Sequence, residues 1–160
     1  MPSNVEIERK FLVDSAHRVL LAKHEGVFIK QGYLSSNLQQ TVRIRIKGDQ
    51  AFLTVKGKTS GISRTEIESP ISFIAATALF EVFIENEVEK IRREIIFEGK
   101  LWEVDEFLGR HKGLWLAEIE LGSEEEEFIR PAWLGKEVSL EEGYFNSNLA
   151  KNGLQGIALE

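Results

Sequence analysis

Two glutamates and a lysine stand at alternate positions near the start of the chain, as Glu6, Glu8 and Lys10. Alternate side chains of a β-strand point to one face, so these three charged groups would line up together. Two carboxylates on one face repel each other, and a cation between them would relieve that repulsion. A solvated strand face explains this segment when it is taken alone, but the same arrangement recurs along the chain.

Several later segments also carry charges at every second position. Cations occupy such positions in 41–47 and 88–97, and carboxylates occupy them in 101–107 and 114–121. The intervening positions are mostly apolar, although Arg93 falls between two isoleucines. Arginine pairs and glutamate pairs repeated at this spacing are a more selective choice than the mixed polar residues of an ordinary solvated strand.

These patterns predict a chain made mainly of strands joined by hairpins. We expect strands over 6–13, 27–34, 41–47, 51–56, 64–68, 88–97, 101–107 and 114–121. Helical patterns cover 16–23, 72–86 and 144–152. Ser123 and Glu126 have the spacing of a capping box and predict a short acidic helix that ends at Pro131. We expect residues 133–135 to form a loop.

The largely antiparallel sheet that follows from these hairpins can be built in two ways. An open sheet would place its apolar face on the helices and its charged face in water. A closed barrel would turn the charged face inward, and roughly eight strands would leave room inside for side chains and one small ligand. The alternation alone is equally compatible with both architectures.

Length and composition limit the classes of protein. The chain of 160 residues suits a single domain spanning 1–160, and its formal net charge of −6 argues against binding nucleic acid through bulk charge. It has no cysteine, and its histidines, His17, His24 and His111, lack metal-site spacing and are expected at the surface. No membrane-spanning run or secretory signal pattern is visible, so we expect no membrane partner and a cytoplasmic location.

Eight segments in order resemble the motifs of the CYTH, or triphosphate tunnel metalloenzyme, superfamily. Residues 6–13 match its E-x-E-x-K opening and the apolar residues after it. The remaining segments of the resemblance are 31–34, 42–45, 53–57, 64–68, 90–92, 102–105 and 117–120. From residue 133 through Tyr144 and Asn146 to 149–150, the chain resembles the short bacterial inorganic triphosphatases.

The resemblance implies a mainly β (α+β) fold, a closed antiparallel eight-stranded β-barrel with helices packed outside. Its polar interior would be a tunnel that holds a triphosphate and a divalent metal, which favours the inward-facing arrangement of charges. Arginine suits phosphate because its planar fork donates two hydrogen bonds at once. The substrate-binding candidates are Lys10, Arg43, Arg45, Lys56 and Arg92. Arg64 is as well explained as an exposed strand cation.

Carboxylates in such a tunnel would repel phosphate unless a metal ion intervened. Mg²⁺ or Mn²⁺ prefers oxygen ligands and bridges carboxylates to phosphate oxygens. The metal-ligand candidates are Glu6, Glu8, Glu118 and Glu120, while Glu66, Glu68 and Glu103 could balance the cations instead. A purely structural network of inward salt bridges would use the same residues, but so much buried charge is costly without a ligand.

Hydrolysis requires a water molecule in line with the terminal phosphorus and stabilisation of the transferring group. Asp105 or a glutamate could accept the proton of that water. The resemblance implies that Lys90 and Tyr33 form a pair near the scissile phosphate, with Lys90 neutralising developing charge. Tyr33 could instead be an ordinary packing residue of the barrel.

We therefore expect a metal-dependent hydrolase of inorganic triphosphate or of a similar compact triphosphate. The resemblance also leaves open a class IV adenylate cyclase or a thiamine triphosphatase, although no sequence element clearly holds adenine and ribose. A non-catalytic binder of polyphosphate or nucleotide would need only the cations, and the carboxylates favour catalysis over that function. The sequence leaves the assembly state open, with a homodimer as one option.

Overall fold

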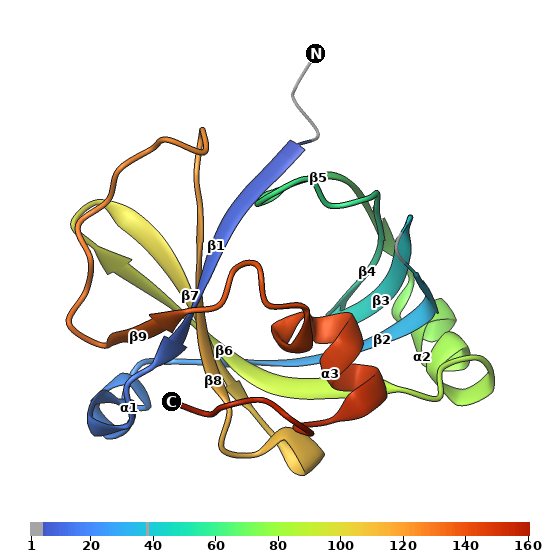
Figure 1. Ribbon diagram of the computed structural model, residues 1–160. Helices are drawn as coiled ribbons and strands as arrows, with labels where there is room; N and C mark the ends of the chain where they lie inside the picture. The colour runs from blue at the N-terminus through green and yellow to red at the C-terminus, as the bar shows by residue number, and fades with distance from the viewer. Residues whose placement is uncertain (1–4, 38) are drawn as a thin grey trace.

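The computed structural model describes residues 5–37 and 39–160, and its main feature is a closed β-barrel (Figure 1). Eight antiparallel strands form the barrel, and a ninth extends the sheet at one edge. The strands are β1 (Val5–Val13), β2 (Val27–Ser36), β3 (Thr41–Lys47), β4 (Gln50–Lys56), β5 (Ser63–Ile71), β6 (Glu87–Phe97), β7 (Lys100–Phe107), β8 (Trp115–Glu120) and β9 (Leu134–Glu137). The eight predicted strands and the predicted barrel are thus confirmed.

The barrel closes because β1 pairs with strands on both of its sides. On one side β1 pairs with β8 along 8–12. On the other side it pairs with β5 through only three residues, 5–7, and with β9 near its end, at Phe11 and Val13. The first strand therefore divides one edge between the barrel closure and the extra strand.

The described residues form three α-helices and two short 3₁₀ turns. They are α1 (Ser15–Leu21), α2 (Phe73–Val82), α3 (Asn146–Asn152), η1 (Gly109–His111) and η2 (Glu142–Tyr144). Asp14 caps α1 and Ser72 caps α2, each by accepting a hydrogen bond from a backbone N–H of the first turn. No helix in the described part of the chain is long and apolar enough to cross a membrane.

The outer face of the barrel is apolar and lies under other elements of the chain. Under α2, Ile44 of β3 and Ala51 of β4 pack against Ala76 of the helix. A Cβ atom at Gly32 on β2 would collide with the side chains of Phe80 and Ile84, so only glycine lets this part of the chain approach the strand. On the other side of the barrel, a second apolar cluster includes Phe11, Trp102 and Trp133.

The interior of the barrel changes character from one end to the other. Apolar side chains that include Leu12, Phe107 and Leu116 fill one end and pack against Leu149 and Ala150 of α3. In Figure 1, α3 and the segment before it cross the space between β1 and β2. The other end is lined with charged side chains. Whereas α2 packs outside, as expected, α3 closes the apolar end.

Three predictions about the C-terminal half were wrong. Residues 123–131 form turns and irregular chain instead of a helix, because the Glu126 carboxylate accepts hydrogen bonds from the Gly122 N–H and from Lys100. Residues 134–137 form β9 instead of a loop. His111, expected at the surface, is buried between Phe107 and α3.

Other boundaries moved for local reasons. Strand β5 runs from Ser63 to Ile71 and passes through Pro70, although the expected strand covered only 64–68. Pro70 pairs only with Phe52 of β4, and β5 has left β1 by that point, so the missing N–H of proline faces no partner strand. Helix α2 ends earlier than expected and α3 begins two residues after Tyr144, which lies in η2.

Candidate active site

The charged end of the barrel encloses a cavity of about 650 Å³. Every predicted site residue except Asp105 lines it, because the period of two that defines each strand turns these side chains inward. The lining residues from the prediction are Glu6, Glu8, Lys10, Tyr33, Arg43, Arg45, Lys56, Lys90, Arg92, Glu118 and Glu120. Asp105 is fully buried and contacts the cavity-lining side chains Lys90 and Arg92.

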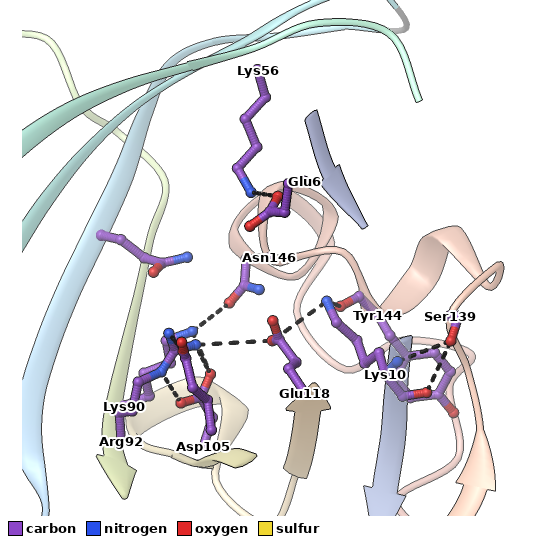
Figure 2. A network of polar contacts seen from close by, with 12 residues as sticks. Glu6, Lys10, Lys56, Lys90, Arg92, Asp105, Glu118, Ser139, Tyr144 and Asn146 are labelled. Carbon is purple, nitrogen blue, oxygen red and sulfur yellow. Dashed lines mark hydrogen bonds and ion pairs between the residues drawn. The ribbon is translucent and has the colours of Figure 1, made fainter. Parts of the chain in front are cut away.

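Lys90, Arg92 and Asp105 form a compact set of ion pairs in the wall, here called the buried group. Strands β6 and β7 place Arg92 directly opposite Asp105. Arg92 donates from Nε and Nη2 to the two carboxylate oxygens, both at 2.7 Å, and Lys90 Nζ lies 2.6 Å from Asp105 Oδ2 (Figure 2). Lys90 and Asp105 have no exposed side-chain surface. The geometry is therefore fixed by pairing and packing together.

Burial sets the electrostatics of this group. Removal from water lowers the pKa of Lys90 to about 7, and the nearby Asp105 carboxylate offsets only part of that effect. Burial alone would raise the pKa of Asp105, but Arg92 and Lys90 together hold it below its usual value. Asp105 thus stays ionised, while Lys90 can change its charge near neutral pH.

A second set of ion pairs, here called the rim group, consists of Glu6, Lys56 and Glu66. Lys56 Nζ lies 2.6 Å from Glu6 Oε2 and 2.8 Å from Glu66 Oε2. These side chains keep part of their surface in water. Burial would lower the pKa of Lys56, but the carboxylates of Glu6 and Glu66 raise it above its usual value. The rim group therefore connects β1, β4 and β5 where the barrel closes.

Two neighbouring arginines on β3 have N–H donors without an acceptor in the part of the chain that the structure describes. Arg43 donates to Thr54 and lies 3.6 Å from Glu68, but its buried Nε–H has no acceptor among these residues. The same is true of the buried Nε–H of Arg45. Burial, together with Arg43 and Arg92, lowers the pKa of Arg45 to about 10. Such donors in a cavity wall can bind an anionic ligand.

The carboxylates of β1 and β8 face each other across the strand pair. Glu8 lies opposite Glu120, and Lys10 lies opposite Glu118. Burial and the neighbouring Glu118 carboxylate raise the pKa of Glu8 well above its usual value. Glu118 Oε1 lies 3.7 Å from Lys10 and 4.0 Å from Arg92, but it accepts no hydrogen bond from any residue in 5–37 or 39–160. The carboxylate oxygens of Glu8 and Glu118 therefore lie close together with too few hydrogen-bond donors to neutralise them.

This donor set fits a divalent cation that also binds a ligand. Burial would raise the pKa of Glu118, but Lys10 and Arg92 hold it well below the usual value, so Glu118 offers a charged oxygen. Within the described residues, no three histidine or carboxylate side chains converge on one point. Mg²⁺ commonly uses only one or two carboxylates and completes its shell with phosphate oxygens and water. Two close carboxylates with an orphaned oxygen match that requirement.

The weaker candidates fall into two classes. Arg64 donates to the Gly57 carbonyl at 2.7 Å and to the Thr41 hydroxyl at 2.8 Å, so it braces the rim while lining the cavity. Glu103 pairs with Arg92 and lines the cavity. Glu66 and Glu68 pair with Lys56 and Arg43, as expected for carboxylates that balance cations.

Sequence reasoning assigned no role to a set of residues that also form the site. Gln31 is buried and donates to the Tyr33 hydroxyl at 3.0 Å, while its own Oε1 has no donor. From the C-terminal segment, Ser139 accepts from the Lys10 backbone N–H at 2.9 Å and Asn146 accepts from Lys90 Nζ at 3.2 Å. Gln31 shares a strand face with Ile29 and Tyr33, and this alternation was the available signal for its burial. Only the resemblance drew attention to Asn146.

Comparison with known proteins agrees with this site. The model of the CYTH domain matches residues 4–152. An inorganic triphosphatase of Acetivibrio thermocellus is 47% identical over 148 residues, covering 92% of this chain and 94% of the relative. An inorganic triphosphatase of Nitrosomonas europaea is 36% identical over 149 residues, covering 91% of this chain and 96% of the relative.

Solved structures show the same architecture. The inorganic triphosphatase NE1496 aligns with a TM-score of 0.63 and 33% identity, over 91% of this chain and 93% of that one. A conserved hypothetical protein from Pyrococcus furiosus, at 20% identity and a TM-score of 0.58, covers 75% of this chain and 80% of its own, and it supports the fold alone. The motifs, the barrel and these matches agree: the chain belongs to the CYTH domain family.

Proposed function

We propose that this protein hydrolyses inorganic triphosphate in the barrel cavity with the help of Mg²⁺ or Mn²⁺. The observation that carries the proposal is the pair of buried Nε–H donors on Arg43 and Arg45, which have no acceptor among the described residues and belong to a cavity lined by opposed charges. Unsatisfied charged donors are costly to bury, so a polyanion that accepts from them stabilises the site. The two relatives named as inorganic triphosphatases support this ligand.

The cations surround the proposed triphosphate from several strands. Arg43 and Arg45 come from β3, Lys56 from β4, Arg92 from β6 and Lys10 from β1. Guanidinium groups can grip two phosphate oxygens each, while lysines supply point charges. A compact chain of phosphates thus meets positive charge on several sides, which suits inorganic triphosphate better than a single phosphate group.

Glu6, Glu8, Glu118 and Glu120 are the residues proposed to hold the metal. A divalent cation there would neutralise phosphate oxygens and lower the pKa of a bound water molecule. On the protein side, burial and the repulsion between the carboxylates of Glu8 and Glu118 together raise the pKa of Glu8. The pair is therefore arranged to receive positive charge.

Lys90 and Tyr33 are the groups proposed to act on the scissile phosphate. Lys90 lines the cavity, and its ammonium group would stabilise the charge that develops as the terminal phosphoryl group leaves. The Tyr33 hydroxyl accepts a hydrogen bond from Gln31, which leaves its own proton available to a phosphate oxygen. Asp105 contacts both Lys90 and Arg92, so its geometry favours holding these cations over accepting a proton from water.

Substrate comparison tests the proposal directly. Phosphate release from tripolyphosphate, ATP and thiamine triphosphate is measured with Mg²⁺, with Mn²⁺ and with excess chelator. We expect tripolyphosphate to give the highest kcat/KM, with activity lost in chelator. Calorimetric binding of tripolyphosphate without phosphate release would identify a non-catalytic binder, and cyclic AMP formed from ATP would identify a cyclase. A cytoplasmic location and an absence of nucleic-acid partners stay predictions from the sequence.

A further inference from the structure

The ammonium group of Lys90 contacts acceptors from two different parts of the fold. Nζ lies 2.6 Å from Asp105 Oδ2 on β7 and 3.2 Å from Asn146 Oδ1 on α3 (Figure 2). An ammonium group has three N–H donors, so these contacts use two of them. Nζ also lies 5.4 Å from the centre of the Phe107 ring, but no further hydrogen-bond acceptor among the described residues takes the third donor. Because Lys90 lines the cavity, a ligand there can accept from it.

Asp105 alone does not fix the direction of that third donor. Both of its oxygens already accept hydrogen bonds from Arg92, and Oδ2 is shared with Lys90. A single shared acceptor lets the ammonium group rotate about one contact, whereas a second acceptor defines its orientation. Asn146 is the partner that supplies this second direction.

Asn146 makes this contact from an unusual place. Asparagine near a helix start often accepts a hydrogen bond from a backbone N–H, but no side chain of the described residues caps the N-terminus of α3. The carbonyl oxygen of Asn146 instead reaches β6, which is 56 residues away along the chain. The helix is held independently, because His111 Nε2 lies 2.6 Å from the Leu149 carbonyl oxygen.

We propose that Asn146 is a positioning residue that aims the Lys90 ammonium group at the terminal phosphate. The inference rests on the proposed triphosphatase function. As a neutral acceptor, the amide stabilises the ammonium form without drawing the proton away, and a carboxylate at the same point would compete with phosphate for the cation. Asn146 thus acts on the reaction only through Lys90.

The charges around Lys90 come from four strands, and they determine what a pH profile reports. The charged groups that face it are Asp105 on β7, Arg92 on β6, Glu118 on β8 and Arg45 on β3. Because Lys90 would act as the ammonium ion, kcat should fall as the pH rises through its pKa. Loss of the Asn146 acceptor weakens the ammonium form and moves this fall to lower pH, whereas an added carboxylate moves it to higher pH.

Three variants test the proposal in steady-state hydrolysis of tripolyphosphate across pH. Asn146→Leu removes the acceptor at similar size, Asn146→Asp adds a negative charge, and Asn148→Ala is the matched control. Asn148 lies on the same helix and donates to the Glu142 carbonyl oxygen, away from Lys90. We expect Asn146→Leu to lower kcat about tenfold, the effect of one hydrogen bond to a charged group, with little change in KM.

The direction of the pH shifts distinguishes positioning from packing. We expect the alkaline fall in kcat to move down in Asn146→Leu, up in Asn146→Asp and not at all in Asn148→Ala. If both Asn146 variants lose kcat without opposite shifts, or match the control, the proposal is overturned. Thermal melts monitor the fold, and if Asn146→Leu does not fold, Asn146→Ser replaces it with the same expected directions.

A readout independent of turnover separates this inference from the proposed function. The Lys90 Nζ resonance is followed by NMR in protein labelled with ¹⁵N-lysine, without metal, and is identified by its loss in Lys90→Met. We expect its titration to shift in opposite directions in the two Asn146 variants. If these shifts occur in a protein that does not hydrolyse tripolyphosphate, they would support the contact between Asn146 and Lys90 and refute the proposed triphosphatase function. Their absence in an active enzyme would refute the role of Asn146.

Discussion

The buried group and the rim group use the same chemistry at two depths of one cavity. In the buried group, the Lys90 and Asp105 side chains are 0% exposed, and each partner has a defined place. In the rim group, the side chains of Lys56, Glu6 and Glu66 are 16%, 23% and 22% exposed. Water can therefore compensate the rim charges when a partner is lost, and it cannot do so in the buried group.

This difference indicates at which stage of the proposed reaction each group can act. A fixed, dehydrated cation is worth most where charge develops, because nothing has to reorganise during the reaction. A partly hydrated pair can rearrange around an incoming metal or phosphate. Five predictions test this division, beginning with the largest expected effect.

Asp105→Ala should destabilise the protein most. The change leaves Lys90 and Arg92 buried without their shared counter-charge, and breaking a buried pair from one side costs on the order of 3–5 kcal/mol. Urea unfolding at neutral pH measures the change in the free energy of unfolding. A loss comparable with that of an exposed pair would contradict the contrast between the two groups.

The same carboxylate also makes stability depend on pH. Arg92 and Lys90 hold the pKa of Asp105 below its usual value of 3.8, overcoming the opposite effect of burial. Its folded-state pKa is therefore depressed, so its stabilisation is present above pH 3.8 and is lost as the pH falls through the folded-state value. The Asp105→Ala variant should lack this part of the acid transition.

Lys90→Ala and Arg45→Ala should affect different kinetic constants. Lys90 would act where charge develops, and losing one preorganised group of that kind costs about 10²–10³ in kcat. Arg45 should bind phosphate equally in the ground state and the transition state, so its loss mainly raises KM. Kinetics on tripolyphosphate, with calorimetric binding to the Lys90 variant, measures both. An unchanged kcat in Lys90→Ala would remove Lys90 from the catalytic residues.

Glu6→Gln and Glu120→Gln should weaken the dependence on metal while the fold survives. Both residues line the cavity, and the cations proposed to bind phosphate remain in place. We expect turnover to fall and the half-saturating Mg²⁺ or Mn²⁺ concentration to rise about tenfold or more. A metal titration at saturating tripolyphosphate tests this. Wild-type activity with an unchanged titration in either variant would refute that ligand assignment.

Lys56→Gln should have the smallest effect on stability. Its two partners are partly hydrated, and pairs of this kind contribute about 0–1 kcal/mol. We expect a raised KM for tripolyphosphate and a weaker salt dependence of kcat/KM, because the change removes a charge that is proposed to bind phosphate. Urea unfolding beside Asp105→Ala makes the comparison direct. Equal destabilisation by the two changes would show that the rim is as rigid as the buried wall.

Strand alternation explains how much of this could be read from the sequence. A period of two is a local signal, so the sequence of a segment such as 41–47 predicts both the strand and the face that carries charge. The structure confirms those faces and gives Arg93 an explanation outside the barrel. There it donates to Glu106 at 2.8 Å and lies over the Trp115 ring at 5.4 Å. What alternation could not separate was an open sheet from a closed barrel.

The features that were missed depend on contacts between distant segments. Strand β9 has only four residues without alternation, and it forms because the exposed edge of β1 is available beyond β5. His111 is buried because α3 packs over it, and Asn146 meets Lys90 for the same reason. The predicted acidic helix does not form, because the Glu126 carboxylate accepts hydrogen bonds from Gly122 and Lys100 instead of capping the first turn of a helix. None of these contacts has a local signature.

The divided edge of β1 has a consequence for how the chain folds. Its partners β8 and β9 lie at the far end of the sequence, and its contact with β5 involves only three residues. Most of the pairing of β1 can therefore form only after the C-terminal strands have been synthesised. Until then, Glu6, Glu8 and Lys10 keep one face of β1 hydrophilic, and charged side chains on an unpaired strand discourage pairing with another chain. The side chains proposed to bind metal and phosphate would therefore have a second effect, on the solubility of the newly made chain.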